Sequence, residues 1–303
     1  MRVLITGAKG QVGQHLVKNF SQEVTLLALG KEDLDVTNED EVIKCVHEFK
    51  PDFVINSSAY TNVEEAEVNK DICYLINKMG AKYLASASAT CGATIIHIST
   101  DYVFSGDTDN QSYLECDFAG PINTYGKSKL EGECEVIANN HRHIILRTAW
   151  LFSSFSNNFV TTMLRLGQSR KELGIVADQL GGPTDADDVA NVIIAIICKL
   201  YMSNERKYGV YHYSGYPYVS WYDFADKIFD IAHKKNLLIK PYLKKMTTSQ
   251  YITNVKRPYN TRLNCSKIKR DYNIDPCNWA SKLEMLLDRE ILNENHIYKN
   301  TRR

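Results

Sequence analysis

The sequence lacks the features that mark several large classes of protein. Its eight cysteines, at positions 45, 73, 91, 116, 134, 198, 265 and 277, contain no C-x-x-C pair and no metal-ligand cluster. Isolated cysteines of this kind are expected to be reduced thiols of a cytosolic protein. Lysine plus arginine and aspartate plus glutamate both total 36, so no basic excess points to nucleic acid or an anionic membrane.

Long apolar runs are also missing. The longest, Val192 to Leu200, is too short to cross a bilayer and follows an aspartate-rich stretch. We interpret it as a buried helix. The chain opens on Met-Arg-Val-Leu-Ile-Thr-Gly, which runs directly into an expected strand, so we predict a cytoplasmic protein without a signal peptide.

The first half alternates short apolar runs with amphipathic stretches, a pattern typical of βαβ units. We expect strands at 3–5, 24–29, 53–56, 94–99 and 144–147, and helices at 11–19, 40–49, 63–89 and 128–138. After Trp150 the pattern changes, with helices expected at 158–166, 186–200 and 221–233 and a strand at 209–213. The sequence therefore predicts an α/β protein. Residues 1–150 would form a Rossmann-type doubly wound parallel sheet, a fold that can bind dinucleotides such as NAD(P) at the edge of the sheet. Residues 151–303 would form a smaller substrate-binding α/β domain, with some segments returning to the first.

Three glycines, Gly7, Gly10 and Gly13, lie between the first expected strand and the first helix. Backbone N–H groups at such a turn can bind the pyrophosphate of a dinucleotide. The spacing G-x-x-G-x-x-G is the one used by tyrosine-dependent short-chain reductases. On this motif alone, a tight turn without a ligand remains an alternative.

Tyr125 and Lys129 lie four residues apart and would be neighbours on one face of a helix. A free tyrosine has a pKa of about 10, and a nearby ammonium would lower that pKa by favouring the phenolate. The pair could then protonate the oxygen that hydride transfer creates. Thr100 follows an expected strand and could hydrogen-bond both Tyr125 and a substrate carbonyl. The alternative is a turn at the end of the strand that Ser or Thr caps without a catalytic role.

The choice between NAD and NADP should be made where the second strand ends, about 20 residues beyond the glycines. Gly30 offers no carboxylate to a ribose 2′-hydroxyl, and Lys31 could meet a 2′-phosphate or simply be solvated. We predict NADPH as the cofactor, with NADH tolerated. The residues expected further along the cofactor are Asp35 and Val36 near the adenine, and Ser58, Ala59 and Tyr60 after the third strand.

Seven motifs occur in order along the chain: Thr6-Gly7-x-x-Gly10-Gln11-x-Gly13, Ser99-Thr100-Asp101-Tyr102-Val103-Phe104, Tyr125-Gly-Lys-Ser-Lys129, Arg147-Thr-Ala-Trp150, Asn158-Phe-Val-x-Thr-Met-Leu-Arg165, Asp178-Gln179-x-Gly-x-Pro183-Thr184 and Arg257-Pro258-x-Asn260. The set resembles the dTDP-4-dehydrorhamnose reductases of the extended short-chain dehydrogenase/reductase superfamily, over about residues 1 to 275. The resemblance implies reduction of the C4 ketone of dTDP-4-dehydro-β-L-rhamnose to dTDP-β-L-rhamnose with NAD(P)H, a step that supplies a polysaccharide precursor.

The resemblance also implies roles for particular residues. Gly10, Gln11 and Val12 would hold the pyrophosphate, Tyr125 would be the acid, and Lys129 would contact the ribose. The residues implied at the sugar nucleotide are Thr100, Asp101, Trp150, Asn158 and Gln179. We add Arg257 as a partner for the diphosphate, because a guanidinium suits bidentate phosphate binding; an exposed arginine before a turn is the alternative.

The chain departs from the family at several positions. Some members bind magnesium at a dimer interface through a glutamate in the first helix, where this chain has His15. No metal ligand is therefore assigned, and both the magnesium ion and a homodimer stay open. Tyr251-Ile-Thr253 stands where the family has Tyr-Pro-Thr, and Ser57 and Ser58 replace alanines.

Other functions are compatible with the same fold. A 4,6-dehydratase would need a carboxylate where this chain has Tyr102, and a 4-epimerase would retain its cofactor. A reductase of another dTDP-4-keto-6-deoxy sugar would carry the same motifs. A non-catalytic regulatory subunit, similar to the β subunit of methionine adenosyltransferase, could also keep them.

Overall fold

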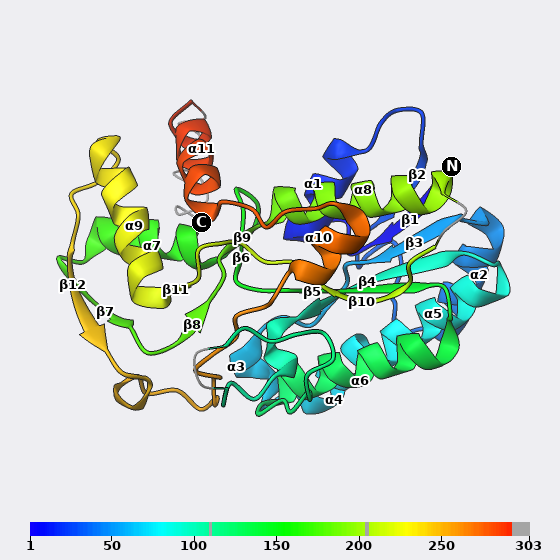
Figure 1. Ribbon diagram of the computed structural model, residues 1–303, viewed down its shortest axis with the longest axis horizontal. Coiled ribbons are helices and arrows are strands. Elements are labelled where there is room, and N and C mark those ends of the chain that lie inside the picture. Colours follow the sequence, from blue (N-terminus) through cyan, green and yellow to red (C-terminus); the bar gives the residue numbers. More distant parts are fainter. Residues whose placement is uncertain (109–110, 204–205, 293–303) are drawn as a thin grey trace.

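The structure is a computed structural model that describes residues 1–108, 111–203 and 206–292. Figure 1 shows a twisted sheet covered by helices on both faces, with a smaller body beside it. Residues 293–303, the end of the predicted second domain, lie outside the described residues.

The sheet has six parallel strands in the order β10-β5-β4-β3-β1-β2. The strands are β1 (Arg2–Thr6), β2 (Thr25–Leu29), β3 (Phe53–Asn56), β4 (Thr94–Thr100), β5 (His143–Thr148) and β10 (Gly209–His212). This order confirms the predicted Rossmann-type sheet. The sixth strand, β10, comes from the second half of the chain, so the sheet is completed only after residue 209.

Helices cover both faces of the sheet (Figure 1). One face carries α1 (Gln11–Asn19), α8 (Ala186–Met202) and α10 (Ser266–Tyr272), and the other carries α2 (Glu39–Phe49), α5 (Ala81–Thr90) and α6 (Thr124–Asn139). Successive strand residues point to opposite faces, so Val3 and Ile5 pack with α1 and α8 while Leu4 packs with α2 and α5. Burial on both faces explains why these strands are apolar throughout.

The segment 63–89, predicted as one helix, is interrupted. It contains α3 (Val63–Ala66), α4 (Lys70–Tyr74), a π-helix (Leu75–Gly80) and then α5. The Asn62 side chain accepts the Glu65 N–H at the start of α3, and Asn69 precedes α4 without a side-chain cap. Asparagine favours caps of the kind that Asn62 forms over helix interiors. The single helix was therefore a wrong prediction, and π-helical turns of this kind often occur at functional sites.

Helix α6 begins at Thr124, four residues before its predicted start. The Asn123 side chain accepts the Gly126 N–H at 2.8 Å and caps the first turn. Tyr125 and Lys129 therefore lie on the same helix. Gly126 lets this turn approach the end of β4, because a Cβ there would lie 2.1 Å from the carbonyl oxygen of Tyr102.

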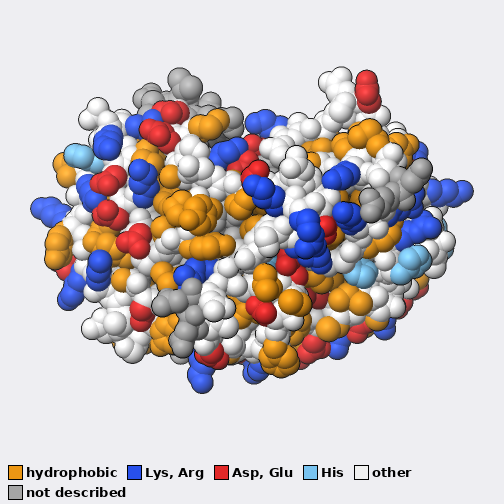
Figure 2. Space-filling view, in the orientation of Figure 1, with side chains coloured by type: hydrophobic (Ala, Val, Ile, Leu, Met, Phe, Trp, Pro, Cys, Tyr) orange, Lys and Arg blue, Asp and Glu red, His pale blue; other side chains and the backbone are white. Residues whose placement is uncertain are grey.

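The second body is built on α7 (Phe159–Ser169), α9 (Trp221–Lys234) and α11 (Trp279–Leu292). Its strands form short pairs: β7 (Glu172–Val176) with β12 (Tyr242–Met246), β8 (Leu180–Gly181) with β11 (Val219–Ser220), and β6 (Leu151–Phe152) with β9 (Thr184–Asp185). No described helix is long and apolar enough to cross a membrane. Charged side chains of both signs are interspersed over the face shown in Figure 2.

Candidate active site

A cavity of about 390 Å³ lies at the carboxyl ends of the central strands. Parallel α/β sheets bind ligands at this edge. The cavity lining comes from five segments: the glycine turn, the segment after β3, the end of β4, α6 and the segment after β5. Among the predicted site residues, the lining includes Gly10, Gln11, Val12, Ala59, Thr100, Asp101, Tyr125, Lys129 and Trp150.

The glycine turn brings backbone N–H groups to the cavity. Gly7 has a φ of +71°, and a Cβ there would lie 2.7 Å from the backbone of Ser57 and Ser58. A Cβ on Gly13 would lie 2.3 Å from the Gly7 carbonyl oxygen. The first and third glycines thus allow the close packing, while Gly10 at the start of α1 faces the cavity. The free N–H groups of this helix N-terminus suit a pyrophosphate.

Thr100, Tyr125 and Lys129 meet in the cavity wall, as the sequence predicts. Burial raises the pKa of Tyr125 above its usual value, and the nearby Thr100 side chain opposes that rise only in part. The expected lowering of that pKa by Lys129 was therefore wrong. Lys129 is 2% exposed and donates a hydrogen bond from Nζ to the Ile98 carbonyl oxygen at 2.7 Å. Burial lowers the pKa of Lys129 to about 8, against an opposing effect of Glu133.

Asp101 adds an acid beside these three residues. Its side chain is 2% exposed, and its Oδ1 accepts a hydrogen bond from Thr100 Oγ1 at 3.1 Å. Burial raises the pKa of Asp101 to about 7. Near neutral pH a carboxyl with this pKa is partly protonated, and the protonated form can donate a hydrogen bond to a ligand.

Three buried polar atoms on the lining have no hydrogen-bond partner among the described residues. They are Oε1 of Gln11, Oδ2 of Asp101 and Oγ1 of Thr148. Buried polar groups are nearly always satisfied, so such atoms indicate a polar ligand. Thr148 was missed by the sequence analysis, although it ends β5 at the same sheet edge as Thr100 ends β4.

Asn77 lies outside the cavity lining but supports the segments that form it, and the sequence analysis also missed this residue. From the π-helix, its Oδ1 accepts the Tyr60 N–H at 2.8 Å and its Nδ2 donates to Ser128 Oγ at 2.9 Å. It thereby ties the segment after β3 to α6. An asparagine inside an expected helix gave no sequence signal for this role.

Trp150 forms an aromatic part of the lining, as predicted. Its φ is +44°, in the left-handed region. Its ring stacks on Trp221 with centroids 3.5 Å apart and planes within 6°. Gly181 makes room for the ring, because a Cβ there would lie 2.4 Å from it. Trp221 starts α9 in the second body and was missed, since the contact joins residues 71 positions apart.

The residues predicted to choose the cofactor lie beyond the cavity lining. Gly30 follows β2, and Lys31 next to it is exposed. The Lys9 side chain from the glycine turn lies across Gly30, 2.9 Å from where a Cβ would be, and its Nζ pairs with Glu32 at 2.7 Å. Lys9 therefore brings a second ammonium to this position. Further along, Asp35 accepts hydrogen bonds from Thr37, and Val36 is buried against Gly80.

Three predicted substrate residues also lie outside the cavity lining. Asn158 caps α7 through its Oδ1, which accepts the Thr161 N–H at 3.2 Å. Gln179 donates from Nε2 to Thr248 Oγ1 at 3.1 Å. Arg257 pairs with Glu64 at 2.9 Å, while its buried Nε has no hydrogen-bond partner within the described ranges. Both Glu64 and the Tyr102 hydroxyl help to keep the pKa of Arg257 high, against the effect of burial.

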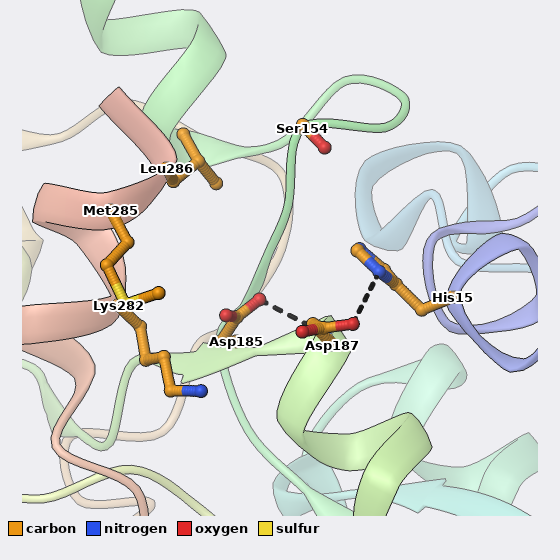
Figure 3. Close-up of a pocket in the computed structure, with 7 residues that line it drawn as sticks. All are labelled: His15, Ser154, Asp185, Asp187, Lys282, Met285 and Leu286. Carbon is orange, nitrogen blue, oxygen red and sulfur yellow. Dashed lines mark hydrogen bonds and ion pairs between the residues drawn. The ribbon is translucent and has the colours of Figure 1, made fainter. Parts of the chain in front are cut away.

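His15 lies in a different and much smaller cavity of about 30 Å³, shown in Figure 3. Its Nδ1 is 3.0 Å from Asp187 Oδ1, and Asp185 Oδ1 accepts the Asp187 N–H at the start of α8. Lys282 lines the same cavity and pairs with Asp188 at 2.6 Å. Magnesium prefers oxygen ligands, and in this cavity Asp187 is paired with the His15 imidazole while the Lys282 ammonium adds positive charge beside Asp185 and Asp187. This donor set does not suit magnesium, and no described group of three or more potential ligands is arranged to hold a metal.

Comparisons with known proteins identify the family of the chain. A family model described as RmlD substrate binding domain matches residues 1–291. The dTDP-4-dehydrorhamnose reductase of Aggregatibacter actinomycetemcomitans is 45% identical over 288 residues, which cover 93% of this chain and 97% of that protein.

Solved structures give the same result. A dTDP-4-dehydrorhamnose reductase of Clostridium acetobutylicum superposes with a TM-score of 0.89 at 38% identity, covering 95% of this chain and 99% of that one. The enzyme of the same name from Bacillus anthracis, solved in complex with NADP, gives a TM-score of 0.88 at 36% identity, again covering 95% of this chain and 99% of that one. The resemblance seen in the motifs is confirmed, and the chain belongs to the RmlD family of dTDP-4-dehydrorhamnose reductases.

Proposed function

We propose that this protein reduces the C4 ketone of dTDP-4-dehydro-β-L-rhamnose to dTDP-β-L-rhamnose, using NADPH. The observation that carries the proposal is the meeting of Thr100, Tyr125 and Lys129 in one cavity wall, beside the glycine turn. The relatives that match nearly the whole chain are named dTDP-4-dehydrorhamnose reductases. A nicotinamide cofactor bound at the turn supplies the hydride.

The residues of the chain supply the proton and the orientation. Ketone reduction needs a donor that holds its proton until negative charge develops on the oxygen. Burial keeps Tyr125 in the phenol form at neutral pH. Thr100 lines the same cavity and would orient the phenol through its hydroxyl. Lys129, when protonated, stabilises the phenolate that remains after the proton leaves.

The cofactor is proposed to be NADPH, with NADH accepted more weakly. Lys31 and Lys9 both lie near the end of β2, where a 2′-phosphate would be recognised. A 2′-phosphate attracts cationic side chains, whereas NADH offers a hydroxyl at the same position. The Bacillus anthracis relative was solved with NADP.

The sugar nucleotide is proposed to bind between the two bodies of the chain. Trp150 would pack against the sugar, and Asp101 would hydrogen-bond one of its hydroxyls. Arg257 would bind the diphosphate, because its buried Nε–H has no hydrogen-bond partner among the described residues. Asn158 and Gln179 would act indirectly, since both are used in hydrogen bonds that shape neighbouring segments.

One assay tests this function. The enzyme is mixed with NADPH and enzymatically generated dTDP-4-keto sugar, cofactor oxidation is followed by absorbance, and the product is identified by NMR. We expect stoichiometric oxidation and dTDP-β-L-rhamnose as product. Cofactor that stays bound and unoxidised while the C4 centre is inverted would indicate an epimerase. An absence of turnover together with tight binding to a second protein would indicate a regulatory subunit.

A further inference from the structure

His97 lies directly behind the site but outside the cavity lining. It is on β4, opposite Asn56 of the neighbouring strand β3, and it is 1% exposed. Its Nδ1 is 3.0 Å from Asn56 Nδ2, and its Nε2 is 3.4 Å from Lys129 Nζ. A neutral histidine carries one ring proton, so the position of that proton decides what Lys129 meets.

The orientation of the Asn56 amide is fixed by its other contacts. Its Oδ1 is 3.1 Å from the Ser58 backbone N–H and 3.2 Å from Thr6 Oγ1. A backbone N–H can only donate, so the atom that faces it must be the amide oxygen. The amide nitrogen therefore faces His97 and donates to its Nδ1.

It follows that Nδ1 of His97 carries a lone pair and the proton lies on Nε2. Burial keeps the pKa of His97 well below its ordinary value, so the ring is neutral. The Nε2–H then points at Lys129 Nζ, which already donates to the Ile98 carbonyl oxygen at 2.7 Å. An ammonium has three donors and no acceptor, whereas an uncharged amine can accept this hydrogen.

We propose that Asn56 holds His97 in the Nε2–H tautomer, and that His97 thereby acts as a positioning residue that favours the uncharged amine form of Lys129. The proposal rests on the proposed function in one respect only, namely that the ammonium form of Lys129 supports reduction. His97 then sets the upper pH limit of activity. Turnover falls when Lys129 loses its proton, and His97 makes that loss occur at lower pH.

Other groups near Lys129 do not cancel this effect. The titratable or charged groups around it are Tyr125 and Glu133 on α6, Cys73 on α4, Asp101 after β4 and, beyond Glu133, Arg147 on β5. Glu133 favours the ammonium, but its carboxylate accepts from Arg147 Nη2 at 2.6 Å and from Ser99 Oγ at 2.5 Å. Its charge is thus largely balanced by Arg147. Burial is the largest cause of the lowered pKa of Lys129, and an N–H aimed at Nζ would act in the same direction.

The tautomer can be observed without any turnover. Protein with ¹⁵N-labelled histidine is studied by long-range ¹H–¹⁵N correlation NMR, and the His97 signals are those missing in His97→Phe. We expect the pattern of a neutral Nε2–H ring between about pH 6 and 9. A Nδ1–H pattern, or a protonated ring, would overturn the proposal. If the Nε2–H pattern is seen but no sugar is reduced, the proposed function fails alone.

The effect on Lys129 is tested by the sign of a pH shift. Removing the N–H in His97→Phe should move the upper limb of kcat against pH upwards by about half to one pH unit, a roughly three- to tenfold change in acid dissociation. If Nε2 instead accepted from the ammonium, the limb would move downwards. Thermal unfolding of each variant shows that the fold is kept.

A second variant gives the same test if His97→Phe does not fold. Asn56→Asp keeps an oxygen for Ser58 N–H and accepts from Nδ1–H, which turns the Nε2 lone pair towards Lys129. The upper limb should again move upwards, and an unchanged limb would contradict the proposal. Asn140→Asp is the matched control, because Asn140 is a buried asparagine at the far end of α6. It should alter stability without shifting the profile.

Discussion

The two walls of the cavity are built in different ways. The wall on α6 and β4 consists of buried polar groups, and burial displaces the pKa values of Tyr125, Lys129 and Asp101. The other wall is the ring of Trp150, stacked on Trp221 in the second body. The first wall controls where protons lie, and the second controls shape. Changes to the first should therefore lower kcat, whereas changes to the second should raise KM for the sugar.

The largest effect is expected from Tyr125→Phe. The change removes the proton donor and leaves the ring in place beside Tyr102. General acid catalysis contributes about 10²- to 10⁴-fold, so kcat should fall by that factor while the Kd of NADPH stays the same. Steady-state kinetics and fluorescence titration measure the two quantities. Near-normal turnover would show that another group donates the proton.

The second wall is tested by Trp221→Ala. Loss of the stacked ring should lower the free energy of unfolding by about 2 kcal/mol and leave Trp150 without support. We expect a several-fold higher KM for the sugar nucleotide and an unchanged affinity for NADPH. Trp221→Phe keeps an aromatic ring, so its stability and its KM for the sugar nucleotide should lie between those of the wild type and those of Trp221→Ala. A lower kcat with normal KM would mean that the two walls are not separable.

Arg257→Ala should raise KM for the sugar nucleotide by about 10- to 150-fold, as expected for a charge-assisted contact of about 1.5–3 kcal/mol. The matched control is Glu64→Gln, since Glu64 pairs with Arg257 in the structure. If Arg257 binds the diphosphate, removing the competing carboxylate should not raise KM. If the ion pair only joins α3 to the segment that contains Arg257, both variants should show reduced stability and little change in KM.

The smallest effect is expected from Lys31→Ala. An exposed contact with a 2′-phosphate is worth little, so KM for NADPH should rise by about fivefold at most, with no change for NADH. Lys9→Ala provides the comparison, because Lys9 lies nearer to Gly30. Equal effects on both cofactors would exclude Lys31 as a contact to the phosphate.

The polar wall could be predicted from the sequence because its residues come from short motifs. Gly10, Tyr125 and Lys129 are fixed by local spacing, and Thr100 by the end of a strand. The same reasoning failed for the pKa of Tyr125, because burial depends on the packing of several distant segments. The parallel sheet followed from alternating apolar and amphipathic segments, whereas the break in 63–89, at Asn69 and the π-helix, was hidden by a continuous helical periodicity.

The aromatic wall and the supporting residues were largely missed. Trp221 meets Trp150 only because the second body folds back onto the segment after β5. Asn56 and His97 become partners through the register of two strands 41 residues apart. Neither relationship leaves a periodic trace in the sequence. Such contacts are set by tertiary structure and become visible only when the strands are paired.

Completion of the sheet by β10 has a consequence for synthesis of the protein on the ribosome. Until Gly209–His212 is made, the edge of β5 at Ile144–Leu146 has no partner on that side. Roughly 60 residues separate β5 from β10, which takes about 3–12 s at about 5–20 residues/s. An unpaired apolar edge can pair with another chain. The nascent protein should therefore be most exposed to aggregation in this interval, and stalling translation before residue 209 should increase chaperone binding.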